Sequence, residues 1–154
     1  MSTDLERVEF KVLLSGEWFR LPPHVKVYID DQLIEDLEVV ERSALGEQRT
    51  LEFDAELSDG EHELRIQYLD KEQPDTRVDE NGNIDADHIV NIDSIEIDEI
   101  ELGFMCYNKS VFRPDQELRP DLPAEMHELI NIGYNGVWVM KFQVPTYIWF
   151  LENL

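Results

Sequence analysis

The sequence predicts a mainly β protein, an antiparallel β-sandwich or jelly-roll with one short helix and a C-terminal extension. Apolar and polar residues alternate along several short segments, as they do in strands that bury one face. Turn-forming residues separate these segments, and no helices alternate with strands as a parallel sheet would require. With 154 residues, the chain is long enough for one domain with an ordinary core.

Each predicted strand shows either this alternation or a short apolar run bounded by turn residues. They cover residues 8–14, 25–29, 33–40, 50–57, 61–69, 89–102 and 137–144. Aspartates at 30 and 31 favour a turn that makes a hairpin of the second and third strands. The clearest predicted hairpin joins the fourth and fifth strands around Gly60, because glycine adopts a positive φ readily.

Residues 70–88 form a polar excursion in which Asn81-Gly82 predicts a type I′ turn and hence an acidic β-tongue. The following strand, residues 89–102, changes its buried parity twice. We therefore expect β-bulges or a bend near Asp93 and near Asp98.

The pattern of apolar and polar residues changes after Gly103. We divide the chain into a sandwich over residues 1–103 and an extension over 104–154, which packs on the same domain or on a neighbouring subunit. Within the extension, residues 103–123 predict an extended excursion and residues 123–131 a short helix, with Pro123 at its start. The apolar end of the chain needs a cover, so it predicts an interface through Val144, Tyr147, Trp149 and Phe150.

Charge excludes several functions. Thirteen Lys and Arg against 35 Asp and Glu give a net charge of −22, which opposes direct binding to nucleic acid or to an anionic membrane.

The acidic N-terminus lacks the features of a signal peptide, and no apolar run is long enough to span a membrane. We expect synthesis in a cytoplasm and higher stability in salt, because salt screens self-repulsion.

The tongue is the candidate metal site. Oxygen-bearing side chains alternate along it, and Ca²⁺ binds six to eight oxygens. The strict EF-hand pattern fails, because Arg77 and His88 occupy its first and last ligand positions, so a solvated hairpin tip is the alternative. The candidate ligands are Asp79, Asn81, Asn83, Asp85 and Asp87.

Trp18 and Phe19 lie in a loop between strands and are candidate contacts for a sugar or a protein partner. Catalysis has less support. The acidic residues between Asp93 and Glu101 are typical of the solvent-exposed face of any acidic strand. Cys106 lacks the surrounding sequence motifs that mark a nucleophilic cysteine in known enzyme families. We therefore expect no enzyme.

Residues 8–102 resemble the small β-sandwich carbohydrate-binding modules of the Ca²⁺-dependent, xylan-binding kind. The resemblance rests on VKVYIDDQLIEDLEV, TLEFDAELSDGEHELRIQYL and NIDSIEIDEIEL. It implies acidic loops that ligate Ca²⁺ together with sugar hydroxyls. The tail, GYNGVWVMKFQVPTYIWFLENL, lies outside such modules.

The whole chain also resembles small acidic virion structural proteins of tailed bacteriophages, particularly of marine or cyanobacterial hosts. That resemblance implies a capsid-decoration or tail-associated protein that contacts other virion proteins or itself and becomes part of a virion. Our leading hypothesis is this non-enzymatic structural role. A free-standing Ca²⁺-dependent sugar-binding module is the alternative, and an acidic nucleic-acid mimic that inhibits a DNA-binding protein is a third.

Overall fold

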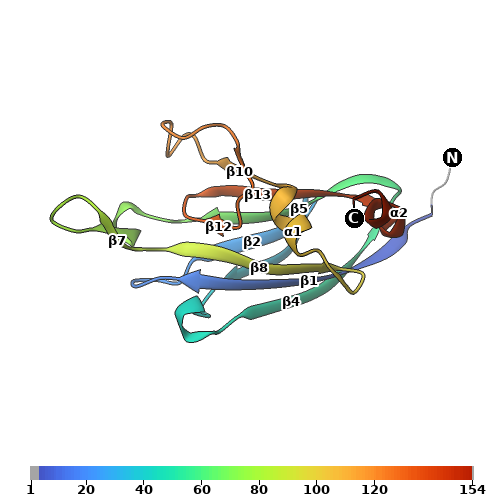
Figure 1. Ribbon diagram of the computed structural model, residues 1–154, viewed down its shortest axis with the longest axis horizontal. Helices are drawn as coiled ribbons and strands as arrows, with labels where there is room; N and C mark the ends of the chain where they lie inside the picture. Colours follow the sequence, from blue (N-terminus) through green and yellow to red (C-terminus); the bar gives the residue numbers. More distant parts are fainter. Residues whose placement is uncertain (1–3, 154) are drawn as a thin grey trace.

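The computed structural model describes residues 4–153 and is an antiparallel β-sandwich (Figure 1). The strands are β1 (Glu6–Glu17), β2 (His24–Ile29), β3 (Gln32–Glu38), β4 (Arg49–Leu57), β5 (Gly60–Leu69), β6 (Thr76–Val78), β7 (Ile84–Asp87), β8 (Ile89–Ile97), β9 (Ile100–Glu101), β10 (Ser110–Pro114), β11 (Met126–His127), β12 (Asn131–Ile132) and β13 (Gly136–Val144). The helices are α1 (Phe104–Asn108) and α2 (Thr146–Asn153), with 3₁₀ turns η1 (Ser43–Leu45) and η2 (Gln73–Asp75). No helix within residues 4–153 is long and apolar enough to cross a membrane.

Two sheets face each other. Sheet A has the order β12-β8-β1-β4, with β9 paired to β8, and sheet B has the order β11-β10-β13-β5-β2-β3. A third, two-stranded sheet, β6-β7, projects from one end of the sandwich as the predicted tongue (Figure 1). The predicted fold class is confirmed.

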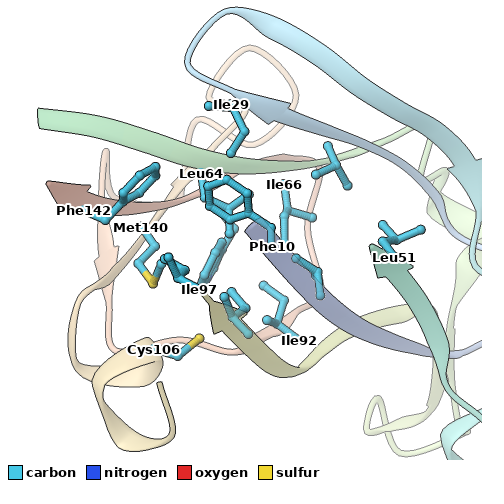
Figure 2. Close-up of a cluster of buried hydrophobic side chains, with 14 of the residues drawn as sticks. Phe10, Ile29, Leu51, Leu64, Ile66, Ile92, Ile97, Cys106, Met140 and Phe142 are labelled. Carbon is cyan, nitrogen blue, oxygen red and sulfur yellow. The ribbon is translucent and has the colours of Figure 1, made fainter. Parts of the chain in front are cut away.

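The core lies between the sheets and is built from the alternate residues that each strand turns inward. Figure 2 shows side chains from both sheets converging, with Phe10 of sheet A near Phe142 of sheet B. The Phe10 ring stacks on Phe53 at 5.1 Å and meets Phe142 edge-on at 5.5 Å. Burying a large apolar side chain contributes about 1.5–3 kcal/mol, so this alternation is what holds the two sheets together.

The predicted β2–β3 hairpin is confirmed, with Ile29 opposite Gln32. The predicted hairpin of β4 and β5 is wrong, because β4 pairs with β1 in sheet A whereas β5 pairs with β2 and β13 in sheet B. The turn before Gly60 carries the chain from one sheet to the other. Alternation identifies the buried face of a strand but not its neighbour, which explains the error.

The two expected irregularities in β8 are present. The register of β1 and β8 shifts so that Leu13 faces Ser94 and Leu14 faces Ile92, which leaves Asp93 as a bulge. Asp98 and Glu99 form the tight turn between β8 and β9 and both have positive φ, 50° and 68°. In the tongue the details differ. Gly82 has a φ of 81° while Asn81 does not have a positive φ, so the turn is not type I′.

The predicted helix over 123–131 is wrong. This segment supplies the short strand β11 and continues into β12, which pairs with β8. The backbone of Leu129 is held in place by Ser110, whose hydroxyl bonds both its N–H and its C=O, and by the indole N–H of Trp138 at 2.7 Å. A short isolated helix has little stability of its own, so these tertiary bonds decide the local structure.

Residues 104–153, the described part of the predicted extension, are an integral part of the sandwich. Their longest strand, β13, lies between β10 and β5 in the middle of sheet B, as its two apolar faces indicate. The extension also includes α1, within the segment predicted to be extended, and α2 at the chain end. The chain therefore folds as one sandwich, with β13 joining the two predicted parts.

Candidate functional site

A pocket of about 380 Å³ opens where β2, β3 and β5 end together on one side of sheet B. The strand registers bring these ends together, because His24 lies opposite both Glu38 of β3 and Leu69 of β5. We call it the strand-end pocket. Residues 20–24, 36–38 and 68–72 line it, together with Asp75 and His88.

His24 holds two carboxylates at the pocket surface. Its Nδ1 lies 2.6 Å from an oxygen of Asp70 and its Nε2 lies 2.5 Å from an oxygen of Asp36. Desolvation lowers the pKa of His24, but the hydrogen bonds and charges of Asp70 and Asp36 outweigh it and raise the pKa above its ordinary value. The protonated ring donates to both carboxylates.

These two carboxylates remain accessible. The side chains of Asp36 and Asp70 are 49% and 70% exposed, and each uses only one oxygen on His24. Within residues 4–153 nothing else donates a hydrogen bond to them. The pocket therefore offers charged acceptors that are fixed in place by His24 yet open to a ligand.

His88 forms the buried base of the pocket. Its Nε2 lies 3.1 Å from the backbone N–H groups of both Phe19 and Arg20 and accepts from both, which places the ring proton on Nδ1. Burial lowers the pKa of His88, because desolvation outweighs the attraction of Asp75. Neutral His88 thus positions the loop that carries Phe19 and Arg20, while Arg20 also pairs with the buried Asp75 at 2.8 Å.

A second buried pair ties the tongue to the sandwich. The ammonium of Lys71, whose side chain is only 9% exposed, lies 2.6 Å from Asp87 and also donates to the carbonyl of Gly133. The same Asp87 oxygen accepts from the Thr76 hydroxyl at 2.7 Å and from the His88 N–H at 2.9 Å. The base of the tongue is therefore locked by charge and hydrogen bonds.

The predicted calcium ligands of the tongue do not converge. Asp79 accepts the N–H groups of Asn81 and Asn83, Asp85 pairs with Arg77 at 2.8 Å, and Asp87 is held by Lys71. Among residues 4–153 no cluster of three or more His, Cys, Asp or Glu side chains is arranged to hold a metal ion. As placed here, the tongue does not fit a Ca²⁺ ion, which needs several oxygens directed at one point.

The predicted aromatic contacts lie at the same end of the molecule but are half-covered. The guanidinium of Arg42 stacks 3.7 Å from the Trp18 ring centre, and the Trp18 indole N–H is buried without a partner in the described chain. Phe19 packs edge-on against His88 at 4.7 Å, with Arg77 over its ring. Both aromatics therefore shape the loop beside the pocket.

The predicted apolar interface is largely internal. Val144, Trp149 and Phe150 are 3–4% exposed and belong to the core, because α2 folds back over the end of β13. These three side chains are thus covered by the domain itself. Tyr147 is 63% exposed and is the one member of the predicted set left on the surface.

The acidic residues near β8 have structural partners. Asp98 accepts the Glu9 N–H at 2.9 Å and the Thr146 hydroxyl at 2.5 Å, and Glu96 lies 3.8 Å from Lys11. Cys106 is buried, and burial raises its pKa to about 12, so at neutral pH it is a thiol rather than a nucleophilic thiolate.

No protein-family model and no curated protein sequence matches the chain, but solved structures do. One is a structure of the carbohydrate-binding module vCBM60, described with a circular permutation that links two families of calcium-dependent carbohydrate-binding modules. It has a TM-score of 0.52 and 12% identity over 86% of this chain and 89% of that one. The fold is like that of a carbohydrate-binding module. A second structure, vCBM60 in complex with galactobiose, has a TM-score of 0.49 and 11% identity over 86% of this chain and 96% of that one.

The sequence alone missed the residues that build the strand-end pocket. His24, Asp36 and Asp70 are far apart along the chain and meet only through the pairing of β2 with both β3 and β5. The predicted β2–β3 hairpin already places His24 near Asp36, so this half of the site could have been found from the sequence. The contact of His24 with Asp70 was missed, because the sequence analysis paired β5 with β4 instead of with β2.

Proposed function

We propose that this protein is a non-catalytic carbohydrate-binding domain and that the strand-end pocket binds the sugar. The observation that carries the proposal is the pair of carboxylates, Asp36 and Asp70, fixed by His24 at an open pocket. The likeness of the fold to a carbohydrate-binding module supports it.

The chemistry of the pocket suits a neutral sugar. Sugar hydroxyls donate hydrogen bonds, and bonds to an ionised carboxylate are stronger than neutral ones. Leu21 and the neighbouring prolines line the same pocket and offer apolar surface to the C–H groups of a sugar ring. An acidic sugar would be repelled by a protein with a net charge of −22.

The virion role predicted from the sequence has no support in the comparisons and stays a prediction. Calcium dependence, expected from the sequence resemblance, is the competing prediction. The comparison with a calcium-dependent family supports it, whereas the tongue does not gather the ligands. The proposed contacts therefore use side chains alone, and binding is expected to persist in EDTA.

The experiment is a glycan array followed by calorimetry on the best neutral oligosaccharide, in calcium and in EDTA. Asp36→Asn is expected to weaken binding about tenfold, because one charge-assisted hydrogen bond is lost. Asp54→Asn is the matched control, since the Asp54 side chain is 48% exposed and paired with Arg7, but on sheet A.

Equal effects of the two substitutions would show that the strand-end pocket does not bind the sugar. Loss of binding in EDTA would show that a metal mediates recognition and would overturn direct binding by the carboxylates. Absence of binding to any neutral glycan would overturn the proposed function as a whole.

A further inference from the structure

A second pocket adjoins the strand-end pocket on the far side of β5. It has a volume of about 400 Å³, and its lining includes Arg113, Leu118 and Val137. The two pockets share Tyr68, Leu69 and Asp70. We call this second hollow the loop pocket, because Asp115 and Leu118 of the loop after β10 contribute to its lining.

The register of sheet B aligns the two pockets. Five consecutive strands, β3, β2, β5, β13 and β10, have their ends at the same side of the sheet. His24 lies opposite Glu38 and Leu69, and Gly136 lies opposite Tyr68 and Pro114. With neighbouring strands about 4.8 Å apart, the four intervals span about 19 Å.

The boundary between the pockets is rigid. The side-chain amide of Asn135 accepts the Lys71 N–H at 2.8 Å and donates to the Lys71 carbonyl at 2.9 Å, which fixes the segment after β5 to the start of β13. Gly136 lets β10 approach closely, since a Cβ there would lie 2.4 Å from the Arg113 carbonyl oxygen. The strand ends beneath the two pockets are therefore held together by hydrogen bonds and close packing of the backbone.

Each pocket also has an exposed apolar residue in its lining. Leu21 in the strand-end pocket is 64% exposed and Leu118 in the loop pocket is 60% exposed. Polar acceptors with apolar surface at both ends are the features that an extended sugar chain, with hydroxyl edges and C–H faces, would contact.

We propose that the two pockets form one groove that binds several consecutive units of a neutral oligosaccharide, with separate subsites in the strand-end pocket and the loop pocket. This inference rests on the proposed function and specifies its ligand as a chain rather than a single sugar. Asp70, which lines both pockets, is the residue that adjacent sugar units share.

Calorimetry with graded oligosaccharides tests the groove. The probes are xylose through xylotetraose and galactose through galactotetraose, titrated into the protein and into the Asp36→Asn and Leu118→Ser variants. Affinity is expected to rise with length. Asp36→Asn is expected to weaken both short and long members about tenfold, whereas Leu118→Ser weakens only the longer members, about fivefold.

Leu151→Ser is the matched control, because Leu151 is 76% exposed on α2, at the opposite end of the sandwich (Figure 1). It should change no affinity, and melting temperatures of all variants should confirm folding. A tetrasaccharide that binds no tighter than the single sugar, or that ignores Leu118→Ser, overturns the groove but leaves sugar binding intact. Binding of neither series by a folded protein overturns the groove, whereas the glycan array decides whether the protein binds sugar at all.

Discussion

Replacing Asp87 by Asn tests the buried lock at the base of the tongue. The substitution keeps the shape of the side chain but removes the counterion of Lys71, whose side chain is 9% exposed. Breaking a buried ion pair by removing one partner costs about 3–5 kcal/mol. For a chain of this size, each kcal/mol lowers the melting temperature by about 2–4 °C, so we expect a decrease of about 6–20 °C.

The control is Asp85→Asn in the same strand. Asp85 pairs with Arg77, but both side chains are well exposed, and such surface pairs contribute at most about 1 kcal/mol. Urea and thermal unfolding, followed by tryptophan fluorescence and circular dichroism, would measure both variants in calcium and in EDTA. Equal losses for the two variants that disappear in EDTA would refute the buried lock and favour a calcium site in the tongue.

Three further outcomes are expected. Gly136→Ala should destabilise the fold by about 1–3 kcal/mol in urea unfolding, because its Cβ would overlap the Arg113 carbonyl oxygen; a neutral result would contradict this close packing. His88 has a lowered pKa, so its contribution is complete above the unfolded pKa of about 6.5 and is lost as the pH falls below that value. The stability difference between the wild type and His88→Gln should therefore shrink below pH 6.5 and stay constant from pH 6.5 to 8; no change with pH would refute the assignment of a neutral His88. Raising NaCl from about 0.01 to 0.1 M shortens the screening length from about 30 to 10 Å, so the melting temperature should rise, and a flat profile would show that self-repulsion is unimportant at a charge of −22.

Residue patterns predicted the strands well, because burial of alternate side chains is a local property of each segment. β5 shows this, with the alternate residues His62, Leu64 and Tyr68 buried. Strand pairing is a property of the whole sheet, and no local pattern of residues separates β4 from β5 across the two sheets. The helix predicted after Pro123 failed for the same reason, since Ser110 and Trp138, both outside that segment, bind the Leu129 backbone.

The candidate site was predictable only in part. The sequence singled out the loop with Phe19 and the tongue as separate candidates, and the structure connects them through His88. The exposed carboxylates of the pocket, however, depend on His24, which the sequence presents as an isolated histidine. Its role follows from Asp36 on β3 and Asp70 just after β5, which strand pairing brings to its two ring nitrogens.

The position of the C-terminal helix determines where the protein can be attached to a surface or a label. β1 begins beside α2, where the Thr146 N–H lies 3.4 Å from Glu6, and α2 lies at the end of the sandwich opposite the tongue (Figure 1). A linker, resin or fluorescent tag attached after α2 would leave from the rear of the molecule. Immobilised in that orientation, the protein would present the proposed groove to the solution.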